Sequence, residues 1–191
     1  MKNINDNQLN NAYKQVTNST DRDLFDDNFE LKVFENTKIV VPYLDTEKTN
    51  VKIEKEMISY HNAPPGISFS PGQTMEVAYF KIPIVGSLDL FSALVQNQFY
   101  NREVKYVEGR TLIYREYSSQ QISGNDDVIN GIKERAKIQV DNLIKILENF
   151  KVTAEQFNEN ELKENIKTFI LKERDKRNLK SNSENKLNPF S

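Results

Sequence analysis

The sequence contains no cysteine and no tryptophan, and its only histidine is His61. Without thiols the chain has no disulfide framework, no thiolate nucleophile and no thiolate metal ligand. A single histidine lacks the partner that a zinc site or a catalytic triad requires, so we interpret His61 as an exposed or structural residue. Hydrolysis that depends on histidine is therefore not expected. The absence of disulfides fits a reducing cytoplasm.

Long apolar segments and a dominant charge are also missing. No run of 18 apolar residues occurs, and the polar start of the chain has no apolar centre of the kind a secretory signal needs. The formal net charge is −2, from 26 basic and 28 acidic residues, so no overall positive field draws the chain to nucleic acid or to an anionic membrane. We expect a cytoplasmic protein without a membrane partner.

Glycine-rich phosphate loops are absent as well. The chain has six glycines, and Gly86, Gly109 and Gly124 stand alone, without a following Gly-Lys-Ser or Gly-Lys-Thr. Nucleotide hydrolysis is thus not expected. The sequence points to no cofactor and to no metal site.

The composition that remains is that of a globular protein with a real core. Of 191 residues, 37 % are hydrophobic, and eleven Phe and eight Tyr supply large side chains. We predict an α+β fold, with an antiparallel strand-rich body followed by a C-terminal pair of amphipathic helices. The expected parts are a loosely ordered or weakly helical arm (1–28), an antiparallel β-rich body (29–122), a helical pair packed on that body (123–180) and a linker-like tail (181–191).

The strands of the body are predicted from alternation. Residues 29–33 and 51–54 alternate apolar and charged side chains at the strand period of two, and residues 38–42 are a short β-branched run. Residues 75–82 form a further predicted strand, and Pro83 restricts it to an edge or a bulge.

A hairpin and an undecided segment complete the body. Residues 104–107 and 112–115 flank Gly109, which can adopt positive φ at a tight turn, and this pattern predicts a β-hairpin. Residues 90–99 fit a helix as well as a strand, because Leu90, Phe91, Leu94 and Val95 satisfy both spacings.

The first predicted helix begins near Asp126, after the capping residues of segment 123–126, and carries one apolar stripe at steps of three and four. The ordinary interpretation is packing against the second helix and the sheet. The alternative is an interface, because the pattern approaches a coiled-coil seam, and we expect a protein partner or self-association. The interface candidates are Ile129, Ile132, Ala136, Val140, Leu143 and Leu147.

The second predicted helix begins near Asn158 or Asn160 and ends in a basic run. Basic residues suit the C-terminal end of a helix dipole, and acidic residues are interleaved with them, so a solvated helix end is the favoured interpretation. Contact with nucleic acid is the alternative. The candidates for that contact are Lys172, Arg174, Lys176, Arg177 and Lys180.

One sequence pattern that is typical of metal-dependent nucleases is present. Asp89 followed by Glu103-Val104-Lys105 matches the Asp and Glu-x-Lys pattern, in which two carboxylates hold Mg²⁺ and the lysine assists the attack. The same pattern recurs at Asp23 with Glu30 and Lys32, so it is not specific for a nuclease. The ordinary explanation of these charged residues is the solvated face of a strand.

A further pattern runs through about residues 75–190, and its parts are 80–91, the long helix, Phe157-Asn158, Leu162, Ile166, Ile170, 174–177 and Leu187-Asn188-Pro189-Phe190. With these residues the chain resembles the N-terminal region of a group of uncharacterised bacterial proteins that carry a C-terminal restriction-endonuclease-like domain associated with defence against foreign DNA. The resemblance implies an accessory region that senses, regulates or assembles, and it carries no catalytic residue onto this chain.

The function expected from the sequence is therefore a non-enzymatic interaction or regulatory domain, as the sensing or assembly part of a bacterial defence nuclease. A nucleic-acid-binding module that uses the basic end of the last helix is one alternative. A small metal-dependent nuclease built on Asp89, Glu103 and Lys105 is the other.

Overall fold

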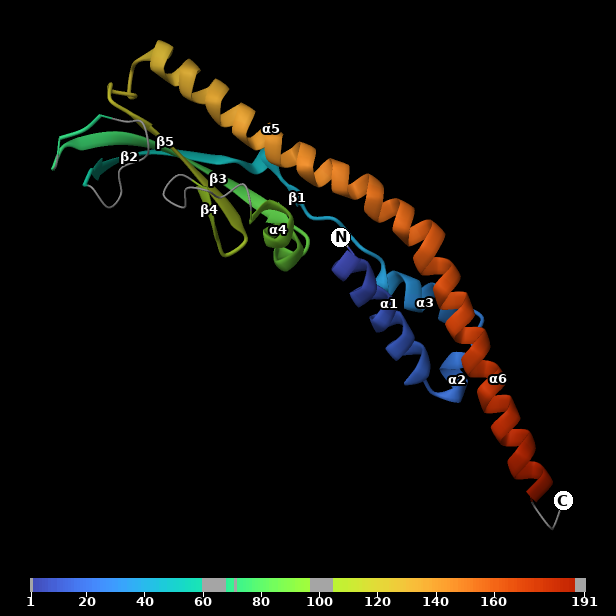
Figure 1. The fold of residues 1–191 in the computed structure, drawn as a ribbon. Coiled ribbons are helices and arrows are strands. Elements are labelled where there is room, and N and C mark those ends of the chain that lie inside the picture. The colour runs from blue at the N-terminus through green and yellow to red at the C-terminus, as the bar shows by residue number, and fades with distance from the viewer. Residues whose placement is uncertain (1, 60–67, 71, 97–104, 188–191) are drawn as a thin grey trace. The chain divides into compact units, whose positions relative to one another are not determined.

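The structure is a computed structural model, and it describes residues 2–59, 68–70, 72–96 and 105–187 (Figure 1). His61 and Glu103 lie outside the described residues. The elements in chain order are α1 (Lys2–Thr17), α2 (Asp21–Leu24), α3 (Phe29–Thr37), β1 (Tyr43–Leu44), η1 (Thr46–Lys48), β2 (Asn50–Met57), β3 (Thr74–Val85), α4 (Leu88–Val95), β4 (Lys105–Glu108), β5 (Thr111–Ser118), α5 (Asp126–Phe157), the π-helical turn η3 (Asn158–Leu162) and α6 (Lys163–Leu187). The predicted α+β class is confirmed.

The chain divides into two compact units. The first unit combines residues 1–40 with residues 152–191, and the second comprises residues 41–151. Helix α5 belongs to the second unit up to Lys151 and to the first from Val152. No helix in the described ranges has both the length and the apolar character to cross a membrane.

The second unit is built on an antiparallel sheet with β3 at its centre. Strand β5 pairs with one side of β3, and β4 pairs with the other side of β5. The remaining side of β3 is shared between β2, which pairs with residues 74–81, and β1, which pairs with Ile84 and Val85. The predicted hairpin is confirmed as β4 and β5, with Gly109 at φ +56° in the turn.

We expected Pro83 to restrict β3 to an edge or a bulge of the sheet, and this prediction is wrong. Pro83 lies where the neighbour of β3 changes from β2 to β1, and on the β5 side it is paired with Thr111. Its carbonyl accepts a hydrogen bond from the amide of Asp45 at 2.9 Å. A proline is tolerated in this central strand because the ladder changes partner there.

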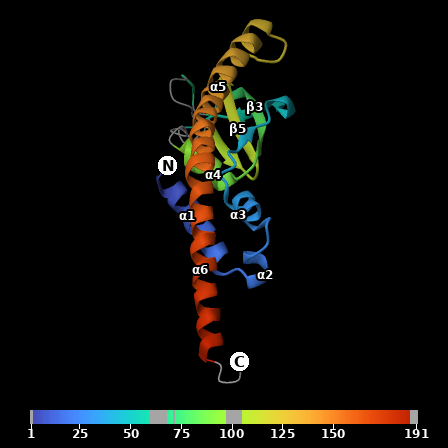
Figure 2. The same cartoon turned by 90° about the vertical axis from the view of Figure 1, so that its right-hand side faces the viewer.

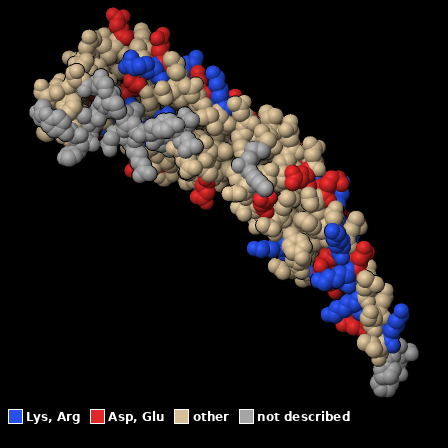
Figure 3. Space-filling view, in the orientation of Figure 1, with Lys and Arg blue, Asp and Glu red and all other residues tan. Residues whose placement is uncertain are grey.

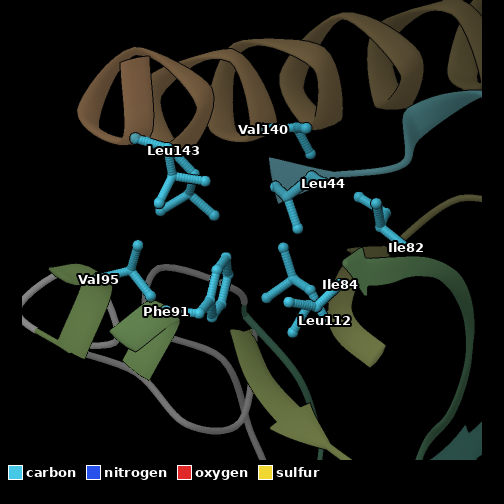
Figure 4. Close-up of a cluster of buried hydrophobic side chains, with 9 residues drawn as sticks. Leu44, Ile82, Ile84, Phe91, Val95, Leu112, Val140 and Leu143 are labelled. Atoms are coloured by element: carbon cyan, nitrogen blue, oxygen red, sulfur yellow. The ribbon is translucent and has the colours of Figure 1, made fainter. Parts of the chain in front are cut away.

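One face of the sheet is covered by helices. The face carries Ile82, Ile84 and Leu112, and α5 lays its apolar stripe on it (Figure 4). Phe91 and Val95 of α4 fill the remaining space. The undecided segment 90–99 is therefore helical up to Val95, and its last residues, 97–99, lie outside the described residues. Helix α5 spans 32 residues, so the long predicted helix is confirmed and is longer than its stripe indicated.

The described secondary structure of the first unit is entirely helical. Helix α1 packs against α3 and α6, and α3 also packs against α6. The side chains that fill its core are Ala12, Val16, Leu24, Phe29, Val33, Phe34, Ala154, Phe157, Leu162, Ile166 and Ile170.

Three expectations about this unit were wrong. Residues 29–33 form the start of helix α3 and not a strand, because Phe29, Val33, Phe34 and Thr37 are buried at helical spacing. The arm, predicted to be loosely ordered or weakly helical, instead carries the helices α1 and α2 and is packed, because Ala12 and Val16 of α1 are fully buried. The tail, predicted to be a linker, is helical up to Leu187 as the end of α6.

Candidate interaction surface on the sheet

Strand β2 forms one border of the sheet, and within the described part of the chain its only strand neighbour is β3 (Figure 2). Residues 51–54 of β2 alternate between β-branched and charged side chains. The β-branched residues favour an extended backbone. All residues of β2 except Glu56 are exposed. The outer backbone groups of an edge strand are free to pair with another strand.

Apolar side chains gather along this edge. Val51, Ile53 and Met57 of β2 are 53 %, 44 % and 69 % exposed. Val51 lies opposite Phe80 and Ile53 opposite Ala78, so both point to the face of the sheet that α5 covers further along. An edge with exposed apolar residues is a site at which strands associate.

The other face of β2 is charged. Lys52 lies opposite Tyr79 and Glu54 opposite Val77, on the face that points away from α5. Neither side chain forms an ion pair with another described residue of its own chain. The edge therefore presents one positive and one negative side chain two positions apart.

Arg115 fixes β2 to the rest of the sheet. It lies on β5, and its guanidinium reaches Glu56 of β2 at 3.5 Å across β3. The rings of Tyr79, Tyr106 and Tyr117 surround the same guanidinium at 5.9, 5.5 and 5.7 Å from their centroids. Such contacts hold the cation by attraction to the ring faces, and the held cation in turn pairs with Glu56 of β2.

A polar cluster lies on the opposite face, between α5 and the sheet. Glu116 accepts hydrogen bonds from the Tyr114 hydroxyl and, at 3.0 Å, from Nε of Arg135 on α5. Burial and the hydrogen bond to Glu116 raise the pKa of Tyr114 well above its usual value. Lys105 donates to Gln139 of α5 at 3.3 Å, and burial lowers the pKa of its amine. These contacts fasten α5 to the sheet.

The proposed nuclease residues are not brought together by the described structure. Asp89 is exposed in the first turn of α4, whereas Lys105 points to α5 from β4. Among the described residues no group of three or more His, Cys, Asp or Glu side chains is placed to hold a metal ion.

The candidates for a helical interface lie in the core of the second unit. Val140, Leu143 and Leu147 pack against the sheet and α4, whereas Ile132 and Ile129 pack around Ala78. Ala136 is buried as well. The structure thus uses this stripe for internal packing, which was the ordinary interpretation.

The basic run of α6 is largely engaged within the first unit. Nε of Arg174 donates to the Leu24 carbonyl at 2.8 Å, and its guanidinium lies 5.5 Å from the centroid of Phe25. Arg177 binds the buried Glu173 at 3.0 Å and Asp21 at 2.7 Å, and both partners raise its pKa. Figure 3 shows acidic and basic side chains mixed over this stretch.

Lys176 and Lys180 also have acidic neighbours. The Lys176 amine lies 3.5 Å from Glu173, and that of Lys180 lies 3.8 Å from Glu184. Lys172 is exposed. Two residues of the run, Arg174 and Arg177, therefore join α6 to α2, and the run does not form a purely positive patch.

The first unit also has a small surface hollow of about 200 Å³. Its volume is below the range usual for ligand pockets. The Lys163 amine lies 4.9 Å from the centroid of Phe34 and is bonded to Glu159, so this cation already has partners. The hollow is lined by Asp27, Glu30, Leu31, Phe34, Lys163 and Ile166.

The strand edge is the feature that sequence reasoning missed. Alternation in residues 51–54 predicted a strand with one wet face, but it did not predict which strand would end the sheet. No protein-family model, no curated protein and no solved structure matches this chain.

Proposed function

We propose that this chain is a non-enzymatic interaction domain, and that it assembles with another protein chain through the outer edge of β2. The observation that supports this proposal most is the exposure of Val51, Ile53 and Met57 on a border strand of eight residues. A strand of a partner that pairs there satisfies backbone donors and acceptors and removes apolar side chains from water.

The charges of β2 give this association selectivity. Lys52, Glu54 and Lys55 interrupt the apolar positions, and charged residues on an edge oppose indiscriminate pairing. A partner strand must then place opposite charges against them, because like charges directly opposite each other are destabilising. These three residues therefore disfavour pairing with most strands and favour a partner strand whose charges are complementary to their own.

The resemblance to the N-terminal regions of restriction-endonuclease-like proteins suggests where such a domain works. We propose that it is the assembly part of a bacterial defence nuclease, with the catalytic chemistry carried by another domain. A test is whether the reading frame, or an adjacent one, encodes an Asp and Glu-x-Lys nuclease domain.

The edge is tested by replacing its apolar residues with charged ones. The double variant Val51→Lys, Ile53→Lys changes only exposed side chains, and Ile138→Lys on α5 is a matched control at a position that is 58 % exposed. The tagged proteins are sedimented in fresh extracts of cells that produce them at native level.

We expect the wild-type chain and the Ile138→Lys control to sediment as a complex, and the double variant to sediment as the free chain, whose mass without the tag is 22.2 kDa. A wild-type chain that sediments alone, or a complex that the double variant leaves intact, contradicts the proposal.

A further inference from the structure

We propose that the strand that pairs with β2 is β2 of a second copy of this chain, antiparallel to it and related by a two-fold axis that passes beside Ile53. The inference rests on the proposed function and names its partner. It would join the sheets of the two copies edge to edge into one continuous sheet.

Symmetry leaves few registers for such a pair. In an antiparallel pair, residues opposite each other point to the same face of the sheet. A two-fold axis perpendicular to the sheet leaves every side chain on the same face of the joined sheet. The axis must therefore pass beside one residue of β2, and this residue lies opposite the same residue of the second copy. Centring on Lys52, Glu54, Lys55 or Glu56 sets a charge against the same charge, which is unfavourable.

Centring on Ile53 removes this conflict. Ile53 then meets Ile53 of the second copy, and Lys52 meets Glu54 of the second copy twice, once on each side of the axis. Val51 meets Lys55, whose aliphatic stem can cover it. The pairing includes residues 50–56, because Asn50 meets Glu56, whereas centring on Val51 pairs a much shorter part of β2.

The side chains that this register uses are the ones the fold leaves exposed. Ile53 is 44 % exposed, and Lys52 and Glu54 have no ion pair with another described residue of their own chain. A second β2 supplies apolar contact for Ile53 and an opposite charge for each of the other two. The strand is thus complementary to itself in one register.

The absence of cysteine permits a direct test of the register. In Ile53→Cys the two sulfurs face each other at the axis, within the distance that a disulfide bridges. In the matched variant Val51→Cys, each cysteine lies opposite Lys55 of the other copy, four residues from its own counterpart and roughly 13 Å away. Both purified variants are treated with oxidised glutathione at the same concentration.

We expect a disulfide-linked dimer from Ile53→Cys and none from Val51→Cys. Equal cross-linking of both variants, or cross-linking of Val51→Cys alone, overturns the register.

Charge reversal tests the ion pairs independently by analytical ultracentrifugation of the purified chain. Lys52→Glu and Glu54→Lys each set like charges opposite each other at two places, and each is expected to weaken the dimer roughly tenfold. The combined variant Lys52→Glu, Glu54→Lys restores both opposite-charge pairs, so its dissociation constant should return to within about threefold of the wild type. A combined variant that is as weak as the single ones overturns the inference.

The outcomes separate this inference from the proposed function. A purified wild-type chain that stays monomeric, while its complex in cell extracts still depends on Val51 and Ile53, overturns the second copy as partner and leaves the edge as the docking site. A complex that is insensitive to both substitutions overturns the edge itself.

Discussion

The amide of Asn158 joins two segments that are far apart in the sequence. Its Oδ1 accepts a hydrogen bond from the Ile39 amide at 2.9 Å, and its Nδ2 donates to the Ile39 carbonyl at 3.0 Å. The side chain is buried and begins the π-helical turn η3. One residue therefore satisfies both backbone groups of Ile39, which would otherwise be buried without partners.

Replacing Asn158 with leucine should lower the free energy of unfolding by about 2–3 kcal/mol, because two buried backbone groups lose their partners at once. Asn165→Ala is the control, since the Asn165 side chain donates to the Glu161 carbonyl, four residues earlier in the adjoining turn η3, and its loss should cost less than about 1 kcal/mol. Urea unfolding followed by circular dichroism measures both. Equal effects of the two substitutions would show that the Ile39 contacts are unimportant.

Glu76 makes the stability of the second unit depend on pH. Its carboxylate accepts hydrogen bonds from the amides of Ser123 and Ile122 at 2.9 and 2.7 Å and from the Ser123 hydroxyl. These bonds, the Ser123 amide first, lower its pKa below the ordinary value of 4.5. Because the folded state favours the carboxylate, this stabilisation is complete above pH 4.5 and is lost as the pH falls below it.

Glu76→Gln should therefore flatten the loss of stability between pH 4.5 and the lower pKa of the folded state. Thermal melts of wild type and variant across this range measure the effect. Glu134→Gln, at an exposed position of α5, is the control and should retain the wild-type slope. An unchanged slope in Glu76→Gln would assign the acid sensitivity to other carboxylates.

At the scale of elements, the turn between β3 and α4 depends on Gly86. Its φ is +102°, and a Cβ at this position would lie 2.9 Å from Cα of Pro42. The guanidinium of Arg110 donates to its carbonyl at 2.5 Å, which brings the β4–β5 hairpin to the same turn. Both the backbone conformation and the close approach require glycine.

Gly86→Ala is expected to destabilise the chain by about 2–3 kcal/mol, because it adds a steric overlap with backbone to the strain of positive φ. Gly124→Ala separates the two causes, since Gly124 has φ +80° and a Cβ added there would have no neighbouring atom within 4 Å. It should cost only about 1 kcal/mol. Chemical unfolding of both variants decides the matter, and equal costs would mean that Pro42 moves away without penalty.

The elements with strong local patterns could be predicted from the sequence. The stripe of α5, the β4–β5 hairpin around Gly109 and the strand β2 follow from spacing that neighbouring residues set. Helix α3 could not be identified from residues 29–33 alone, because Phe29, Leu31 and Val33 alternate as in a strand. Only the positions beyond them, Phe34 and Thr37, complete the buried helical stripe.

The candidate interaction surface could be predicted only in part. Alternation shows that Val51 and Ile53 share one face of a strand, but their exposure depends on β2 being the border of the sheet, which follows from strand order. Strand order is set by pairing between segments far apart in sequence, and local patterns do not contain it.

At the scale of the whole molecule, the first unit shows the same limit more strongly, because it is made from both ends of the chain. The hydrogen bond from Arg174 to Leu24 and that from Arg177 to Asp21 close separations of 150 and 156 residues. Composition showed a basic run with interleaved acids, and that run predicted a solvated helix end. The acidic and carbonyl partners that occupy two of its members come from the opposite end of the sequence.

This distribution of charge predicts that the whole protein does not bind duplex DNA at about 0.15 M salt, where surface charges are screened beyond about 8 Å. The net charge is −2, and Arg174 and Arg177 are engaged within the chain, so few cations remain to release counterions from phosphates. Electrophoretic mobility shift across a salt series measures this, and the triple variant Lys172→Ala, Lys176→Ala, Lys180→Ala should behave as the wild type does. Retention that weakens with salt and disappears in the triple variant would instead make the end of α6 a nucleic-acid contact.

An association measured between copies of this chain should, by the same reasoning, persist after nuclease treatment, because it arises from β2 and not from a shared nucleic acid.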